Sequence, residues 1–108
     1  MEKEVEIAKQ IIVEEINKFG LEVKMFFLFG SRVKGNYTKD SDWDFYIIVD
    51  KDLDFAHKRK LNAQIRRRLA ELRIPNDIII QSESVAEKRK NDVGYLIYYV
   101  LKEGVRIL

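Results

Sequence analysis

The sequence predicts an α/β (α+β) domain in which helices pack on a single mixed β-sheet. Three observations predict this class. Apolar residues at helical spacing alternate along the chain with short apolar runs of strand length. Val, Ile and Phe dominate the short runs, and glycine or proline separates many of the segments. The 108 residues are 46% hydrophobic, which is enough for one core, so residues 1–108 are expected to form one domain.

The first half of the chain contains a helix and two strands. An apolar stripe over residues 3–19 predicts a helix, and Gly20 stands where a glycine ends many helices. Residues 23–29 are β-branched and aromatic, which predicts a buried strand ending at Gly30. A helical turn is expected over residues 31–35 with Ser31 as its N-cap. Residues 42–49 read as a second strand, polar at its start and apolar at its end.

The second half continues the alternation. A long helix is expected over residues 54–72, and Pro75 with Asn76 interrupts it. A third strand covers residues 77–80, and Ser82 or Ser84 caps a short helix that reaches about residue 90. Residues 92–103 predict a last helix ended by Gly104, and residues 105–108 a short edge strand. One sheet with helices on it accommodates this order.

The composition excludes several classes of protein. The net charge is only +2 although 35% of residues are charged, which gives no overall electrostatic argument for direct binding of nucleic acid. The absence of cysteine excludes disulfides and thiolate sites, and the single His57 excludes a multi-histidine zinc site. The start of the chain has no signal-like apolar segment, and no apolar run is long enough to span a membrane. We therefore expect a cytoplasmic protein.

Three aspartates stand at the starts of two predicted strands. Asp42 and Asp44 are spaced i, i+2, which on a regular strand places both on one face, and Asp77 opens the next strand. Neighbouring strands would bring the three carboxylates to one edge of the sheet. Adjacent carboxylates repel one another, and a divalent cation such as Mg²⁺ relieves that repulsion. The alternative is an ordinary polar turn leading into a strand.

A glycine-flanked basic turn precedes these acids. Gly30 allows backbone N–H groups to approach a phosphate closely, and Ser31 adds a hydroxyl at the start of a helical turn. Arg32 and Lys34 are positioned in sequence to neutralise a triphosphate. The spacing of Gly30 and Gly35 is that of a P-loop, but the Lys-Ser/Thr that a P-loop requires is missing. A phosphate turn beside paired acids predicts a metal–nucleotide site.

These residues resemble a known signature. The run from Gly30 to Gly35, followed by Ser41-Asp42-Trp43-Asp44, is similar to the Gly-Ser-x-x-x-Gly…Ser-Asp-x-Asp signature of the DNA polymerase beta-like nucleotidyltransferase superfamily. The short chain resembles its minimal nucleotidyltransferase (MNT, MntA-type) branch. The resemblance implies that Gly30 and Ser31 hold ATP or another nucleoside triphosphate. With Arg32 and Lys34 of the basic turn and Ser41 of the signature, they form the expected nucleotide-binding set. The resemblance also implies two Mg²⁺ ions.

The same resemblance implies a reaction and a partner. Asp42, Asp44 and Asp77 would ligate the metal, and Asp77 would also take the proton of an acceptor hydroxyl. MNT proteins of this size resemble the antitoxins of HEPN–MNT pairs, in which AMP is transferred to a tyrosine of the HEPN toxin. Two alternatives stay open: an antitoxin that neutralises its partner by binding alone, and a catalytic subunit that modifies a small molecule. An oligomer or hetero-oligomer also stays open.

Two helices carry features outside this signature. The segment 95–101 is apolar nearly all round, which is typical of core packing, with partner contact through Tyr98 or Tyr99 as the alternative. The segment 58–68 carries two basic runs, which are typical of a solvated face. Binding of RNA or an acidic partner is the alternative there.

Overall fold

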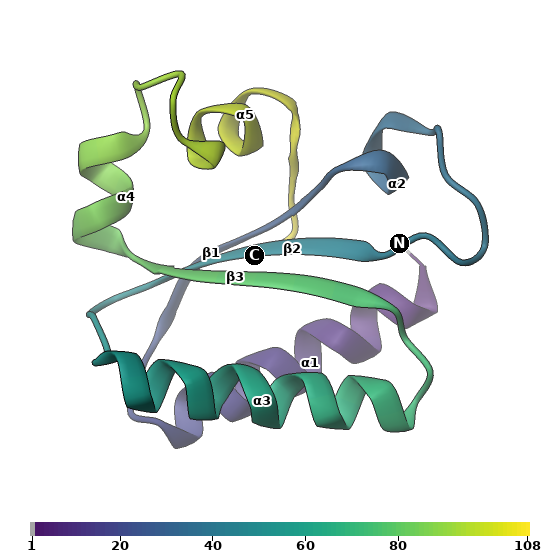
Figure 1. Ribbon diagram of the computed structural model, residues 1–108, viewed down its shortest axis with the longest axis horizontal. Coiled ribbons are helices and arrows are strands. Elements are labelled where there is room, and N and C mark those ends of the chain that lie inside the picture. Colours follow the sequence, from purple (N-terminus) through teal and green to yellow (C-terminus); the bar gives the residue numbers. More distant parts are fainter. Residues whose placement is uncertain (1) are drawn as a thin grey trace.

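The computed structural model describes residues 2–108 as one α/β layer structure (Figure 1). Its nine elements are α1 (Lys3–Lys18), β1 (Val23–Phe29), α2 (Ser31–Lys34), β2 (Trp43–Val49), α3 (Phe55–Glu71), β3 (Asn76–Ser82), α4 (Glu83–Arg89), α5 (Leu96–Glu103) and β4 (Val105–Arg106). This confirms the predicted class, a single mixed sheet with helices packed on it.

The sheet has four strands in the order β3-β2-β1-β4. β1 pairs antiparallel with both β2 and β4, whereas β2 and β3 are parallel and are joined through α3. In the parallel pair, Asp44 lies opposite Asp77 and Tyr46 lies opposite Ile79. Because parallel neighbours start at the same edge, the polar ends of β2 and β3 lie side by side.

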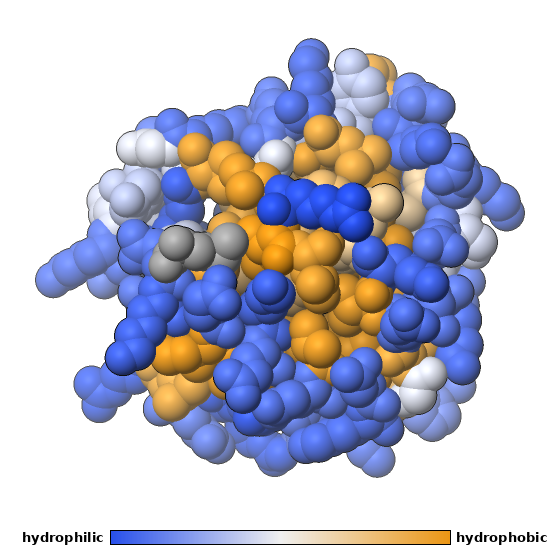
Figure 2. All heavy atoms as spheres, turned by 180° about the vertical axis from the view of Figure 1, so that it is seen from behind, coloured by the Kyte–Doolittle hydropathy of each residue, from blue (hydrophilic) through white to orange (hydrophobic). Residues whose placement is uncertain are grey.

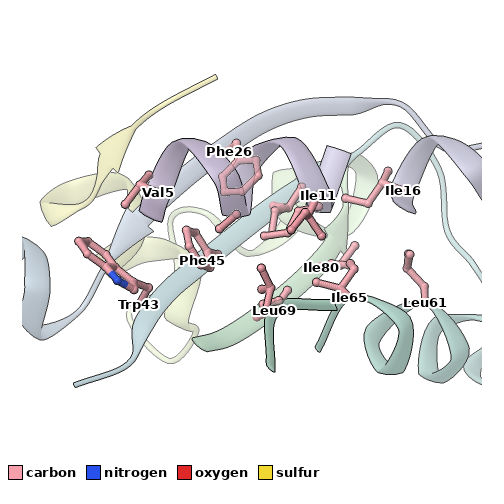
Figure 3. Close-up of a cluster of buried hydrophobic side chains, with 14 of the residues drawn as sticks. Val5, Ile11, Ile16, Phe26, Trp43, Phe45, Leu61, Ile65, Leu69 and Ile80 are labelled. Carbon is pink, nitrogen blue, oxygen red and sulfur yellow. The ribbon is translucent and has the colours of Figure 1, made fainter. Parts of the chain in front are cut away.

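Two helices cover one face of the sheet. α1 and α3 lie together below the strands in Figure 1, and their apolar stripes meet alternate residues of β1, β2 and β3. Figure 3 shows side chains of the sheet and of both helices in one cluster, among them Phe26, Phe45 and Ile80 from the strands, Ile11 and Ile16 from α1, and Leu61, Ile65 and Leu69 from α3. This α1/α3 face holds the larger core.

The opposite face carries a smaller core beneath α4 and α5. Phe27, Tyr46 and Ile48 pack there against Ala86 of α4 and against Ile97 and Val100 of α5. The apolar character of residues 95–101 is thus only partly core, since Leu96, Tyr99 and Leu101 are each at least 40% exposed. In Figure 1, α4 lies over one end of the sheet and α2 over the other, where β2 and β3 begin.

Most predicted boundaries are confirmed within two residues, but the start of the last helix, the place of Asp42 in the second strand and the N-cap of α2 differ from expectation. The last helix begins at Leu96, not 92, because residues 92–95 form a turn in which Gly94 and Tyr95 donate to Asp92. β2 begins at Trp43, so Asp42 precedes the strand. The N-cap of α2 is Gly30 at φ 81°, and Ser31 is already helical.

Apolar side chains also reach the surface. Seen from behind, the molecule shows a band of apolar atoms among polar ones (Figure 2). Val105 and Leu108, at the β4 edge, are 47% and 46% exposed. Within the part of the chain that the structure describes, no helix is both long and apolar enough to traverse a bilayer.

Candidate active site

Asp44 and Asp77 lie next to each other on the α4/α5 face. Alternation along β2 places Asp44 on the same side as Tyr46, and alternation along β3 places Asp77 on the same side as Ile79. The two aspartates are register partners in adjacent strands, about 5 Å apart in the backbone. Asp42 lies two residues before Asp44 in the turn that enters β2, and its side chain is exposed.

The phosphate turn touches the acids directly. Gly30 follows β1, and Phe29 at the end of that strand pairs with Asp44. A Cβ atom added to Gly30 would lie 2.0 Å from Oδ2 of Asp44, so the carboxylate fills the space that any other residue would need. Gly30 also has φ 81°, which disfavours other residues. The glycine is therefore required by two independent constraints, one of which is the carboxylate itself.

The electrostatics of Asp44 indicate a site built for a cation. Burial raises the pKa of Asp44 above its ordinary value, and the charges of Asp77 and Asp42 raise that pKa further. Partial desolvation together with two like charges is costly for an ionised carboxylate. A divalent cation between the carboxylates would reverse the sign of this interaction.

The donor set fits a hard cation that also contacts phosphate. Within residues 2–108, no three Asp, Glu, His or Cys side chains already enclose a position for a metal ion. Mg²⁺ in phosphate-transfer sites is held by one or two carboxylates together with substrate phosphates and water. Asp44 with Asp77 or Asp42 matches that requirement. The residues would accordingly hold Mg²⁺ once a nucleotide supplies the remaining oxygens.

The turn after β1 presents free hydrogen-bond donors. In the described residues, the N–H groups of Ser31 and Arg32 make no hydrogen bond, because the turn's bonds begin with Val33 and Lys34 donating to Gly30. The Ser31 hydroxyl makes none either, and the residue is half-buried. Unpaired N–H groups at the start of a helical turn favour an anion. Gly30 and Ser31 thus lie where a phosphate would meet both donors and acids.

Arg32 and Ser41 are engaged in a different way from the one expected. The Arg32 guanidinium donates to the backbone carbonyls of Ser41 and Lys39, and its Cζ lies 4.2 Å from the Trp43 ring centroid and 4.9 Å from that of Tyr37. The Ser41 hydroxyl accepts from the Thr38 N–H at 2.9 Å. Both side chains hold the loop that delivers Asp42.

Lys34 bridges two elements beside the turn. Its Nζ lies 3.3 Å from Oε2 of Glu103, which joins α2 to α5. A cavity of about 430 Å³ opens between these helices and is lined by Gly30, Lys34 and Tyr99 among others. This cavity adjoins the phosphate turn, so it is placed to receive part of a bound nucleotide.

Asp77 has a basic neighbour that the sequence analysis did not single out. Arg66 of α3 reaches the edge strand, where its Nη2 lies 4.0 Å from Oδ1 of Asp77, and both side chains are 56% exposed. Of the basic residues in the segment 58–68, Arg66 thus faces the aspartates of the site. Only the three-dimensional position of α3 next to β3 identifies it.

Fold and site together define a nucleotidyl-transfer domain. Residues 9–108 match the family model described as polymerase beta, nucleotidyltransferase. The chain therefore belongs to the polymerase beta nucleotidyltransferase family, as its Gly-Ser and Asp-x-Asp residues predict. A search of curated proteins gives no match.

Solved structures share this fold. A mutant of the toxin–antitoxin pair MntA–HpeT in which two aspartates are replaced by glutamate aligns with a TM-score of 0.62 and 17% identity, over 97% of this chain and 72% of that chain. A toxin–antitoxin structure with AMP-PNP aligns with a TM-score of 0.54 and 17% identity, over 91% and 70%. These similarities extend over nearly the whole of this domain.

Proposed function

We propose that this protein is a Mg²⁺-dependent nucleotidyltransferase that transfers AMP from ATP to a tyrosine of a HEPN-type toxin and so acts as its antitoxin. The observation that carries the catalytic part is the contact between Gly30 and Asp44, since it joins the phosphate turn to the carboxylates in one site. The structures of similar fold described as toxin–antitoxin, one of them with AMP-PNP, support the partner and the nucleotide.

Different residues bind the phosphates, hold the metal and accept the proton during the transfer. Free N–H groups at Ser31 and Arg32 bind the phosphates that depart as pyrophosphate. Asp42, Asp44 and Asp77 would hold Mg²⁺, which when bound would polarise the α-phosphoryl group and neutralise its charge. The acceptor oxygen forms a bond to the α-phosphorus while the bond from that phosphorus to the pyrophosphate oxygen breaks. Asp77 receives the hydroxyl proton from the acceptor.

A role in binding alone is the second candidate. Exposed apolar side chains on α5, among them Leu96, Tyr99 and Leu101, provide a surface suited to a protein partner. An antitoxin that only covers its toxin would need this surface and would not need the acids. The two candidates therefore differ in whether Asp44 matters once the complex has formed.

Intact-mass spectrometry of the partner separates the candidates. A HEPN-type protein that binds this chain is incubated with the protein, ATP and Mg²⁺, and its mass is compared with that after incubation with Asp42→Asn/Asp44→Asn protein. We expect a gain of one or more AMP units on a tyrosine with the unaltered protein only. A stable complex without any gain would assign the function to binding.

A further inference from the structure

A second cavity lies on the α4/α5 face, one step along the strands from the acids. It has a volume of about 220 Å³, and Tyr46 and Ile79 line it. These two residues are the next on that face after Asp44 and Asp77, respectively. The cavity therefore adjoins the β2–β3 side of the site, whereas the phosphate turn lies at the end of β1.

The start of α5 brings unpaired donors to this cavity. Leu96 and Ile97, which line it, are the first residues of the eight-residue helix. Their N–H groups make no hydrogen bond within residues 2–108, and the N-cap residue, Tyr95, provides no side-chain cap. Such groups carry the positive end of the helix dipole.

Tyr46 supplies an independent donor from a buried residue. The residue is only 4% exposed, and its hydroxyl makes no hydrogen bond with the described residues. Gln81, also in the lining, accepts from the Ser82 N–H through Oε1 at 3.1 Å, which leaves its NH₂ group available. The Tyr46 hydroxyl itself is not fully enclosed, so it is accessible from the cavity that Tyr46 lines, where a ligand or water can pair with it.

Arg89 adds a fixed positive charge. Its Cζ lies 4.4 Å from the centroid of the Tyr95 ring, and no carboxylate pairs with it in the described part of the chain. Stacking orients the guanidinium while leaving its edge free to donate. Asp and Glu are absent from the described residues that line the cavity. Every polar side chain of the lining is thus able to donate, and the only charge is positive.

We propose that this cavity is an anion-binding subsite that takes a phosphate-sized group beside the transfer site. Tyr46, Arg89 and the N–H groups of Leu96 and Ile97 are its donors. The anion comes either from an acidic group of the acceptor protein near its tyrosine or from the nucleotide itself. The lining of the cavity includes Tyr46 and Ile79 but neither Gly30 nor Ser31, which favours the acceptor, and it shares only Leu96 with the cavity beside Gly30. That role rests on the proposed function, whereas binding of the anion does not.

Titration with inorganic phosphate, followed by the amide resonances of Leu96 and Ile97 in the full chain, tests the subsite. We expect saturable shifts and a dissociation constant that rises about tenfold in Arg89→Gln, as expected for loss of a charged hydrogen bond. Tyr46→Phe keeps the ring and should weaken phosphate binding severalfold. Lys88→Gln removes an exposed charge from the same helix and is the matched control. Shifts confined to residues 30–32, or equal effects of Arg89→Gln and Lys88→Gln, would overturn the proposal.

A second series identifies the source of the anion. Phosphate shifts at Leu96 and Ile97 that persist with saturating Mg²⁺ and AMP-PNP assign the subsite to the acceptor, and shifts that vanish assign it to a nucleotide phosphate. Asp44→Asn protein separates this inference from the proposed function. It should lose AMP transfer and still bind phosphate at α5, whereas loss of the α5 shifts in a folded Asp44→Asn protein would contradict a separate subsite.

Discussion

At the scale of single residues, the closest link between backbone and chemistry is the contact of Gly30 with Asp44. We predict that Gly30→Ala displaces the carboxylate, because the new Cβ would lie 2.0 Å from Oδ2. Transfer activity should fall at least about a hundredfold, as misplacement by an ångström can do. Gly20→Ala is the matched control, since Gly20 also has positive φ but nothing lies within 4 Å of its added Cβ. Both variants should lose about 1 to 3 kcal/mol of stability. Equal activity of the two folded variants would refute the role of the contact.

Arg32 offers a spectroscopic prediction because it stacks on the only tryptophan, Trp43. Arg32→Ala should shift the emission of Trp43 to the red, as water reaches a ring that is now 6% exposed. Arg32→Lys should not restore the emission, since lysine lacks the planar fork that bonds two carbonyls. Lys34→Ala removes a charge from the same turn and should leave the emission unchanged. An unchanged spectrum in folded Arg32→Ala protein would show that Arg32 does not hold this loop.

The residue scale also shows where sequence reasoning stops. The position of Asp44 beside Asp77 was predictable. Two neighbouring strands connected by a helix run parallel, so both begin at the same edge of the sheet. The position of Arg32 was not predictable, because its hydrogen-bond acceptors are backbone carbonyls of a loop. Every residue has such a carbonyl, so residue types do not reveal which ones accept. Arg66 was hidden for a similar reason, as only one member of a basic run reaches Asp77.

At the scale of elements, a buried ion pair fastens α1 to α3. Glu15 is 2% exposed, and Nη1 of Arg68 donates to it at 2.7 Å while Lys18 donates at 3.1 Å. Burial acts to raise the pKa of Glu15, but the hydrogen bonds from Arg68 and Lys18 outweigh burial, so that the pKa lies below its ordinary value of 4.5. The pair thus stabilises the fold in the ionised form.

A pH-dependent loss of stability follows from that direction. Because the pKa of Glu15 is lower in the folded state, its contribution is present above the unfolded pKa and is lost as the pH falls below about 5. Glu15→Gln should cost about 2 kcal/mol at pH 7 in urea unfolding, and the difference from the unaltered protein should shrink at acidic pH. Glu14→Gln, which loses a more exposed partner of Arg68, should cost less. A difference that is the same at pH 7 and pH 3.5 would contradict the assignment.

Element boundaries were predictable where side-chain chemistry marks them. Ser82 caps α4 by accepting from the Val85 N–H, as one of the two expected serines. Gly20, at φ 77°, ends α1 as expected. The start of α5 was missed because the turn at Asp92 resembles the first turn of a helix. Nothing in the apolar run that follows marks where the helix begins. Local hydrogen bonding, which one sequence does not reveal, decided that boundary.

At the scale of the whole molecule, the class of fold was predictable and the full strand order was less so. Parallel pairing of β2 and β3 follows from the intervening α3. The place of β4 beside β1 depends on two residue pairs and on backbone bonds between Phe26 and residues 107–108. That closing strand sets α5 over the α4/α5 face and thereby forms the cavities beside the acids.

Binding of a nucleotide that cannot be turned over tests the central claim, that the acids at the starts of β2 and β3 and the phosphate turn form one metal–nucleotide site. We would measure the calorimetric affinity for AMP-PNP with and without Mg²⁺. Binding should require Mg²⁺ and weaken at least about tenfold in Asp44→Asn. Replacing a residue that only hydrogen-bonds to a metal ligand already lowers metal affinity by about that factor. Asp52→Asn, beyond the far end of β2, should bind like the unaltered protein. Equal Mg²⁺-dependent affinity in folded Asp44→Asn and Asp52→Asn would contradict the claim.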